Sequence, residues 1–363
     1  MKTLFVIDSM ASGGAQRILL NVVQSFRKNN IDVTVLLYRP KENFFLSNLE
    51  SINANVIQIK RKRDGFSLSV LIAIIRLYWQ GYDRTFSFQP TANIYCTMAK
   101  IFSPMTQVFC CEFSITNVWT NKKKRFIANI ANIFASKIIC NSITQKSYLS
   151  SFFPLRKKTI VAWNGYNLAN FKKRNYVPEK LNKLTVIGRI AYPKNGVNFI
   201  KGLQCFFEKT GRTLAVEWVG RRDFDRRSVE MYEEMISLLN RYPALKKNWT
   251  WRGEVENVNQ VYIDTDCIIL PSIFEGLPNV ICEAMIIGCP VLASNVSDIP
   301  IVLGKDSRGI LFEPLVPETI ANALIKFDTM KSRDKTAMIY KARKYAHNNF
   351  DLGRMTATYK ELL

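Results

Sequence analysis

Two glutamates, Glu275 and Glu283, flank a segment whose backbone could bind an anion. The apolar run 268–270 predicts a strand, and a helix is expected to begin near Pro278. Backbone N–H groups at the start of that helix would lack helical partners and would lie at the positive end of the helix dipole. Phosphate is a common occupant of such a site. The residues concerned are Gly276, Leu277, Pro278, Asn279 and Val280.

The two carboxylates suggest that the rest of the ligand carries hydroxyl groups. Glu275 is expected in the loop before the helix and Glu283 inside the helix, so both can face one crevice at the carboxyl end of a parallel sheet. Carboxylates repel phosphate but accept hydrogen bonds from hydroxyls. A diphosphate flanked by two polyols is a nucleotide sugar. The spacing alone is equally compatible with two exposed glutamates beside an ordinary strand–helix turn.

The run E-G-L-P-N-V-I-C-E at 275–283 resembles the E-x7-E signature of retaining GT-B glycosyltransferases of family 4. In that family the second glutamate, here Glu283, binds the donor ribose, and the first, here Glu275, contacts the donor sugar. The resemblance extends over nearly the whole chain. It implies an α/β fold of two Rossmann-like domains that face each other across a cleft, with a C-terminal helix that crosses back to the first domain.

Gly13 and Gly14 follow an expected strand at 4–7 and resemble the G-G-A-x-R loop of the same family. There the glycines line the cleft beneath the transferred sugar. The stretch is not G-x-G-x-x-G, and the next expected strand, 33–37, does not end in the acidic residue of a dinucleotide site. A hydride-transfer enzyme is therefore disfavoured.

A second glycine-ended strand is expected at 184–188, and it is followed by Arg189 and Lys194. These two cations resemble the diphosphate-binding pair of the family, which neutralises the leaving group. A glycine usually follows the lysine there, whereas Asn195 intervenes in this chain. The resemblance makes these residues, with Glu275, the expected catalytic set. Four strand-end glycines and cations complete the expected donor site: Gly188, Gly220, Arg252 and Gly253.

No metal and no cofactor are expected. Two D-x-D strings, 223–225 and 264–266, could suggest a metal-dependent GT-A transferase, but one lies among arginines and the other directly precedes a buried strand. The eight cysteines include no C-x-x-C pair, so we expect buried thiols. The only histidine, His347, lies in the last helical region, which excludes Ser-His and Cys-His catalysis.

An expected strand at 108–113 carries Glu112 near its end, where related enzymes have a polar or charged residue close to the acceptor. Glu112 is therefore the acceptor-side candidate. The stretch 163–166 resembles the N-G turn that closes the first domain of this family, and a charge-rich linker is expected within 171–182. The expected domains are 1–170 with about 345–363, which binds the acceptor and faces the membrane, and 171–344, which binds the donor.

The formal net charge is +22, and residues 1–170 contain 22 Lys and Arg against 7 Asp and Glu. The partner of such a surface is a polyanion, either nucleic acid or an anionic membrane. Basic clusters at 60–63 and 122–125 each precede an apolar helix-like segment. This combination favours a membrane surface as the partner, and no nucleic acid is expected. The alternative is that both segments are core helices with solvated basic ends.

No segment is long and apolar enough to span a bilayer, and the apolar run at the start is broken by Asp8. We therefore expect a cytoplasmic protein, peripherally associated with the inner face of the cell membrane. The expected activity is transfer of a hexose or N-acetylhexosamine, with retention, from a nucleotide sugar to a lipid-linked glycan acceptor in the biosynthesis of cell-surface polysaccharide such as lipopolysaccharide or O-antigen. UDP is the expected carrier, and GDP stays open. A GT-B nucleotide-sugar epimerase and a non-enzymic nucleic-acid-binding protein are the alternatives.

Overall fold

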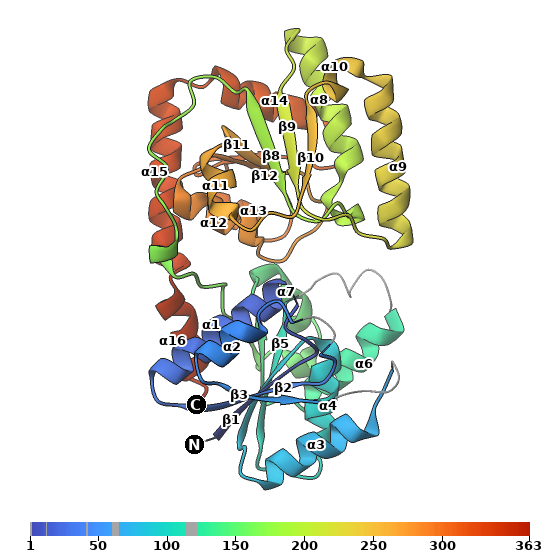
Figure 1. Cartoon of the computed structure of the whole chain (residues 1–363), viewed down its shortest axis with the longest axis vertical. Helices are drawn as coiled ribbons and strands as arrows, with labels where there is room; N and C mark the ends of the chain where they lie inside the picture. The colour runs from blue at the N-terminus through green and yellow to red at the C-terminus, as the bar shows by residue number, and fades with distance from the viewer. Residues whose placement is uncertain (1, 12, 41–42, 60–64, 114–121) are drawn as a thin grey trace. The chain divides into compact units, whose positions relative to one another are not determined.

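The computed structural model describes residues 2–11, 13–40, 43–59, 65–113 and 122–363, and for 122–125 the backbone alone. The basic cluster at 60–63 lies outside the described residues, as do the side chains of the cluster at 122–125. The chain forms two compact units, each built on its own sheet (Figure 1). Unit 1 is Met1–Tyr166 with Phe350–Leu363, and unit 2 is Asn167–Asn349. The units divide a few residues from the boundaries that the sequence suggested.

Unit 1 contains a seven-stranded parallel sheet with the order β3-β2-β1-β4-β5-β6-β7. Continuous apolar runs form its strands because helices cover both faces of a parallel sheet. Alternate residues of the first strand face two separate cores, Leu4 and Val6 on one side and Phe5 and Ile7 on the other. The strands are β1 (Lys2–Ile7), β2 (Asp32–Leu37), β3 (Asn55–Gln58), β4 (Arg84–Phe88), β5 (Gln107–Glu112), β6 (Lys137–Cys140) and β7 (Thr159–Val161).

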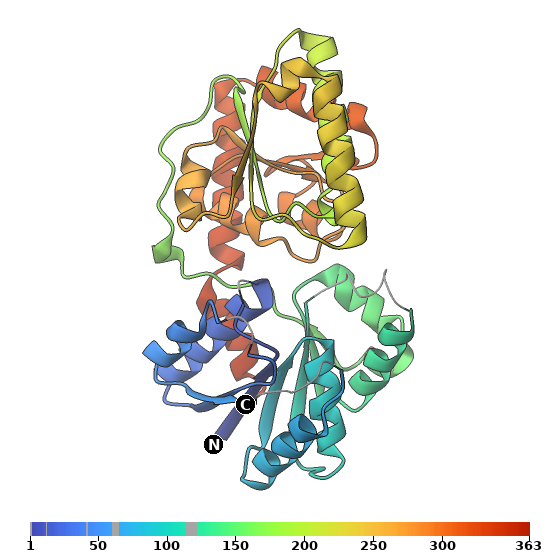
Figure 2. The same cartoon turned by 45° about the vertical axis from the view of Figure 1, so that its right-hand side comes forward.

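Two helix layers cover this sheet, and Figure 2 shows them on either side of the strands. The core of one layer receives side chains from α1 (Gly14–Lys28), α2 (Leu46–Ser51) and α16 (Leu352–Lys360). The other layer consists of α3 (Leu68–Trp79), α4 (Pro90–Lys100), α6 (Lys122–Ile133) and α7 (Ile143–Ser150), followed by the short helix η1 (Phe153–Leu155). Because α16 packs against α1, the last helix of the chain completes the first unit, as the sequence predicted.

Unit 2 contains a six-stranded parallel sheet with the order β10-β9-β8-β11-β12-β13. Its strands are β8 (Lys183–Ile187), β9 (Ala215–Val219), β10 (Trp249–Gly253), β11 (Cys267–Leu270), β12 (Val291–Ser294) and β13 (Ile310–Phe312). Its helices are α8 (Gly196–Thr210), α9 (Arg226–Arg241), α10 (Pro243–Lys246), α11 (Val258–Ile263), α12 (Asn279–Ile287), α13 (Ile299–Leu303), α14 (Pro317–Thr329) and α15 (Ser332–Asn349), with short helices η2 (Leu168–Asn170) and η3 (Tyr192–Lys194). The prediction of two Rossmann-like α/β domains is confirmed.

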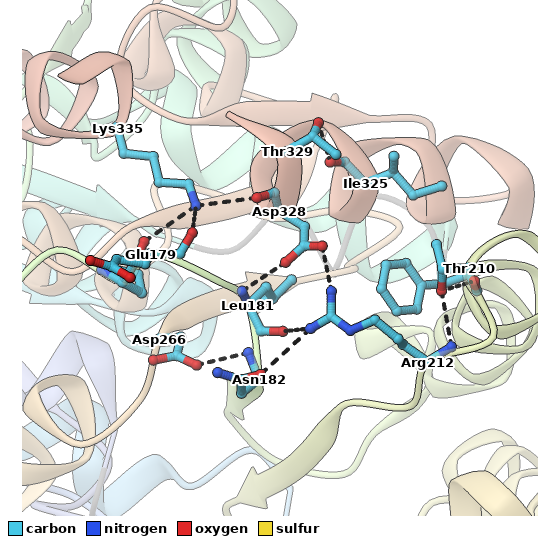
Figure 3. A network of polar contacts seen from close by, with 12 residues as sticks. Glu179, Leu181, Asn182, Thr210, Arg212, Asp266, Ile325, Asp328, Thr329 and Lys335 are labelled. Carbon is cyan, nitrogen blue, oxygen red and sulfur yellow. Dashed lines mark hydrogen bonds and ion pairs between the residues drawn. The ribbon is translucent and has the colours of Figure 1, made fainter. Parts of the chain in front are cut away.

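The segment expected to be a linker is fastened to unit 2 by a polar network (Figure 3). The fully buried Lys335 of α15 donates from Nζ to the carbonyl oxygens of Pro178 at 3.2 Å and Glu179 at 2.7 Å. The carboxylate of Asp328, at the end of α14, accepts from the backbone N–H of Leu181 at 2.8 Å and from Arg212 at 2.5 Å. Burial lowers the pKa of Lys335. This stretch of chain is therefore a fixed part of unit 2.

Candidate functional site

The strand order of the second sheet reverses at β8, which has β9 on one side and β11 on the other. Ligands of open α/β sheets bind beyond the carboxyl ends of the strands at such a reversal. The chain leaves β8 through Gly188 and Arg189, and it leaves β11 toward Glu275 and the start of α12. The predicted residues Arg189, Lys194 and Glu275 thus follow the two strands at the reversal.

Lys194 and Glu275 meet at this point. Lys194 Nζ lies 2.5 Å from Glu275 Oε1, and both side chains are largely buried. The hydroxyl of Ser272 donates to the same carboxylate oxygen at 2.7 Å. Gly188 has a left-handed φ of 149°, and a Cβ there would lie 3.1 Å from Lys194 Cε. The lysine therefore crosses directly over the end of β8 to reach the glutamate.

Asn195, the residue that departs from the family pattern, fixes the loop that carries this lysine. It adopts a left-handed conformation with φ 55°, which asparagine tolerates better than most residues. Its side-chain amide donates to the carbonyl oxygens of Pro271 at 3.0 Å and Pro314 at 2.6 Å. Asn195 thereby attaches the loop after β8 to the end of β11. This attachment helps to hold Lys194 in contact with Glu275.

Arg189 makes a different ion pair. Its Nη1 lies 2.5 Å from Asp223 Oδ2, in the first D-x-D string, and both side chains are accessible to solvent. Backbone hydrogen bonds join the two loops, from Ile190 N to Arg221 O at 2.8 Å and from Asp223 N to Ile190 O at 3.0 Å. Asp223 was missed by sequence reasoning because only the adjacency of β8 and β9 brings it to Arg189.

The predicted helix start after the loop is confirmed. Residues 276–278 form the loop, Pro278 is the N-cap of α12, and Asn279 and Val280 are the first helical residues. Pro278 supplies no side-chain hydrogen bond to the helix. Gly288 ends the helix with φ 90°. The positive end of this nine-residue helix therefore lies a few residues after Glu275.

Glu283 is more enclosed than its expected place in an open crevice suggests. Only 6% of the residue is exposed, and its Oε2 accepts a hydrogen bond of 2.7 Å from the hydroxyl of Tyr262. Tyr262 is fully buried on α11, which packs against α12. No sequence motif pointed to this tyrosine, since α11 and α12 are separated by a strand and a loop.

Gly220, Arg252 and Gly253, the other residues expected in the donor site of unit 2, have structural partners. Gly220 has φ 147°, and a Cβ there would lie 2.2 Å from the carbonyl oxygen of Gly188, so a side chain cannot be accommodated. Arg252 Nη1 pairs with Glu217 Oε1 at 3.2 Å across the neighbouring strands. The carbonyl of Gly253 accepts from Gly220 N at 2.8 Å. These contacts account for the three residues without a ligand, and their donor role stays a prediction.

In unit 1, Gly13 and Gly14 lie where the chain enters α1 after β1. Gly13 is the N-cap of α1 and has an extended φ of −156°, while Gly14 is the first helical residue. A Cβ on Gly13 would lie 2.4 Å from the side-chain oxygen of Gln16, so an added side chain would displace that residue. The predicted turn from strand to helix is confirmed, and its contact with a sugar stays a prediction.

Glu112, the acceptor-side candidate, ends β5 as predicted but is only 1% exposed. Its Oε1 accepts from the side-chain amides of Asn93 on α4 and Asn132 on α6, each at 3.2 Å. Ser87 on β4 donates to Asn93 Oδ1 at 2.7 Å. The sequence did not identify the two asparagines, which fix the carboxylate from two helices.

Asp225 and Asp266 of the D-x-D strings have structural roles. Asp225 caps α9 by accepting from the backbone N–H groups of Arg227 and Ser228, and its hydrogen bond from the Ser228 hydroxyl lowers its pKa. Asp266 Oδ2 accepts from Asn182 N at 2.9 Å and from Lys183 N at 2.8 Å. Within the described residues, no group of three or more His, Cys, Asp and Glu side chains could hold a metal ion.

All eight cysteines are free thiols, as predicted, and seven are buried. Burial raises the pKa of Cys110 to about 12 and that of Cys289 to about 11. Both thiols are therefore protonated at neutral pH and are poor nucleophiles. His347 lies on α15, in a part of the unit that contributes none of the donor residues described above.

Residues 182–328 match a family model described as "Glycosyl transferases group 1". The capsular polysaccharide biosynthesis glycosyltransferase CapH of Staphylococcus aureus is 27% identical over 244 residues, which cover 66% of this chain and 63% of CapH. An N-acetylgalactosaminyltransferase of Campylobacter jejuni, named for a substrate linked to PP-undecaprenol, is 24% identical over 303 residues, 78% of this chain and 77% of that protein.

Solved structures match the whole chain. The crystal structure of Anabaena HepE in complex with UDP and glucose superposes with a TM-score of 0.84 at 19% identity, and covers 100% of this chain and 99% of HepE. Sucrose-phosphate synthase of Thermosynechococcus elongatus gives a TM-score of 0.78 at 15% identity, with 100% and 98% covered. The two units have the fold of GT-B glycosyltransferases, and the sequence matches support a glycosyltransferase role.

Proposed function

We propose that this chain is a retaining glycosyltransferase of family 4 that moves a hexose or N-acetylhexosamine from a UDP-sugar to a lipid-linked glycan in cell-surface polysaccharide biosynthesis. The observation that carries the proposal is the contact of 2.5 Å between Lys194 and Glu275 at the strand reversal. It joins a cation suited to a phosphate and a carboxylate suited to sugar hydroxyls, a few residues before the start of α12.

The ion pairs suggest how the donor binds. Lys194 is held by Glu275 and Arg189 by Asp223, so each cation has a carboxylate partner before a diphosphate arrives. The donor would satisfy both sides of the first pair at once, because its phosphate oxygens accept from Lys194 while its sugar hydroxyls donate to Glu275. Glu283, oriented by Tyr262, would accept from the ribose.

Charge stabilisation by this chain's own residues would drive the departure of the diphosphate. Negative charge develops on the leaving phosphate, and Lys194, Arg189 and the start of α12 would stabilise it. With retention at the anomeric carbon, we favour front-face substitution, in which the departing phosphate oxygen takes the proton of the acceptor hydroxyl. The same positive groups supply the charge that a divalent ion supplies elsewhere, so no metal is required.

The choice of substrates draws on the relatives. HepE was crystallised with UDP and glucose, and an Escherichia coli relative, 27% identical over 221 residues, is named as an enzyme that uses UDP-Gal and a diphosphoundecaprenol-linked acceptor. These names favour UDP as the carrier and a lipid diphosphate as the acceptor. Such an acceptor places the enzyme peripherally at the inner face of the cell membrane, with Glu112 of unit 1 on the acceptor side.

The test is an assay with each of several UDP-sugars, with and without an undecaprenyl-diphosphate-linked saccharide, in which the product masses are recorded. The proposal expects the acceptor to gain one hexose or N-acetylhexosamine. Conversion of the donor sugar in the absence of acceptor would identify an epimerase instead. Absence of any sugar-dependent product, together with tight binding to duplex DNA, would favour the nucleic-acid-binding alternative.

A further inference from the structure

The helix α3 turns large apolar side chains toward solvent. Its outward stripe is Leu68, Ile72, Arg76 and Trp79, which are separated by four, four and three residues and therefore share one face of the helix. Three of these four side chains are large and apolar, and Trp79 is 68% exposed. An outward stripe on a helix of a soluble α/β unit is normally polar.

The helix α6 shows the same feature more strongly, because its small residues face inward. Ala128 and Ala131 are buried, whereas Phe126 and Ile130 on the helix and Phe134 just after it are exposed. The exposed residues are four apart and form a second stripe. Burial of alanine with exposure of phenylalanine reverses the order that a water-facing helix would have.

The helix α4 joins the two stripes into one surface, since it packs against both α3 and α6. The turn after it exposes Ile101, at 67%, and Phe102. Trp79 Nε1 donates to the carbonyl of Phe102 at 3.2 Å, and Lys100 Nζ donates to the carbonyl of Phe134 at 3.3 Å. We call the outward side of α3, α4, α6 and the turn after α4 the apolar face.

The opposite helix layer of the same sheet provides an internal comparison (Figure 2). In the part of the chain that the structure describes, α1, α2 and α16 contribute none of the exposed large apolar side chains. Exposed positions there include Arg17, Lys28 and Arg354. The apolar face is thus a property of one layer and does not reflect the composition of the whole unit.

The excess of positive charge in this part of the sequence indicates which partner binds the apolar face. From 65 to 158 the sequence contains 12 Lys and Arg but only two acidic residues, Asp83 and the buried Glu112. A second copy of the same surface would bring like charges together, and nucleic acid would gain nothing from the exposed apolar side chains. A surface with anionic headgroups above hydrocarbon matches both features.

We propose that the apolar face docks on an anionic lipid bilayer, with Trp79, Ile101 and Phe134 in the boundary between headgroups and acyl chains and the surrounding cations on the headgroups. Tryptophan suits this boundary because its ring is apolar and its N–H is polar. The residues belong to unit 1, which carries the acceptor-side candidate Glu112, so docking would bring the unit that takes the lipid-linked acceptor of the proposed function to the membrane surface. The docking itself does not depend on that function.

The test compares two double variants in vesicle co-sedimentation, without donor or acceptor. Trp79→Gln/Ile101→Gln removes side chains that are 68% and 67% exposed on the apolar face, and Phe44→Gln/Tyr340→Gln removes side chains that are both 67% exposed elsewhere. Neither double variant changes the net charge.

The expected result is a selective loss of vesicle binding. With vesicles of phosphatidylcholine and phosphatidylglycerol, we expect Trp79→Gln/Ile101→Gln to lower the partition coefficient by about tenfold or more and Phe44→Gln/Tyr340→Gln to leave it within about twofold. Pure phosphatidylcholine should bind the wild type less, and added salt should release it.

Equal partitioning of the two variants, or equal wild-type binding to both vesicle types, would overturn the proposal. So would a wild-type dimer in sedimentation velocity that Trp79→Gln/Ile101→Gln converts to monomer, or wild-type binding to duplex DNA in preference to the anionic vesicles. UDP binding and thermal unfolding of each variant report on the fold, and Ile72→Gln/Phe134→Gln serves as a second variant of the face. Because UDP binding is measured separately, failure of vesicle docking and failure of the proposed donor chemistry give different results.

Discussion

At the scale of single residues, the two cations of the proposed donor site already have carboxylate partners. Lys194 lies on Glu275, and Arg189 lies on Asp223. A diphosphate would therefore have to compete with these two carboxylates for the cations. The free energy gained in the transition state is the difference between the interaction of the cations with the carboxylates and their interaction with a phosphate that is gaining negative charge. These two ion pairs would favour the departing diphosphate over other anions only if both cations contact the diphosphate.

Removal of either cation should slow glycosyl transfer without unfolding the protein. Arg189→Ala and Lys194→Ala should each lower kcat by about a hundredfold, because a charge-assisted contact made in the transition state is lost. Steady-state kinetics with a UDP-sugar measures this. Lys201→Ala is the matched control, since Lys201 forms only a surface ion pair of 3.4 Å with Glu234 on the same unit, and it should change kcat by less than about twofold. Wild-type turnover in both site variants would remove these residues from the mechanism.

Tyr262→Phe should weaken donor binding through Glu283. The variant removes one hydroxyl and leaves the buried ring, so a hydrogen bond to a charged group is lost with little change in shape. We expect the KM for the donor to rise by about tenfold, with a smaller change in kcat. Tyr359→Phe removes the hydroxyl of another fully buried tyrosine, on α16 of unit 1, and should leave that KM unchanged. A similar KM in both variants would show that Tyr262 does not orient the glutamate.

Sequence reasoning identified both members of the Lys194–Glu275 pair but only one member of each of the other two pairs. Glu275, Lys194 and Arg189 follow strands and Glu283 lies inside a helix, and such positions are visible in the order of apolar runs and glycines. Asp223 and Tyr262 could not be assigned in this way. Their contacts depend on which strands and helices become neighbours, and that order is a property of the three-dimensional fold.

At the scale of elements, periodicity predicted helices but not the direction of their apolar sides. The apolar run that forms α3 and the segment that forms α6 suggested core helices or membrane elements, and the spacing of residues allowed both. In the structure each helix has a buried apolar side and an exposed apolar side. Ile74 is buried in the core while Trp79 on the same helix is exposed, and Ala131 is buried while Ile130 is exposed. The distinction requires knowledge of which face lies against the sheet.

The segment before β8 shows a second limit of pattern reading. Its charge and prolines suggested a linker, but Lys335 fastens it to α14 and α15 (Figure 3). Lys335→Ala should lower the free energy of unfolding by about 3 kcal/mol, because buried carbonyl groups lose their donor and a cavity remains. Chemical denaturation measures the change. Lys331→Ala, at an exposed position one turn earlier, should cost less than about 0.5 kcal/mol. Equal stability of the two variants would show that the network does not hold the segment.

At the scale of the whole molecule, no helix in the described part of the chain is long and apolar enough to cross a membrane. Two features are relevant to the proposed docking on a membrane: the net charge of +22 and the apolar face of unit 1. Charge was visible in the sequence, and it predicted an anionic partner. The apolar face was not, because exposure appears only when the helices are assembled.

Glycosyl transfer should not require a divalent ion. Arg189, Lys194 and the start of α12 would supply positive charge to the leaving diphosphate, and the carboxylates of Asp223, Asp225 and Asp266 in the D-x-D strings are engaged in an ion pair, a helix cap and backbone contacts. Activity should therefore stay within about twofold in excess EDTA. Complete loss in EDTA that Mn²⁺ restores would contradict this expectation and would make a metal part of the mechanism.

The most direct test of the account is the anomeric configuration of the product. The chain is incubated with an α-linked UDP-sugar that is ¹³C-labelled at the anomeric carbon and with an undecaprenyl-diphosphate-linked saccharide, and the linkage is determined by NMR. The account predicts that the acceptor gains one sugar in α linkage and that Lys194→Ala forms about a hundredfold less of it per unit time. A β-linked product, or a labelled sugar that is altered but never transferred, would contradict it.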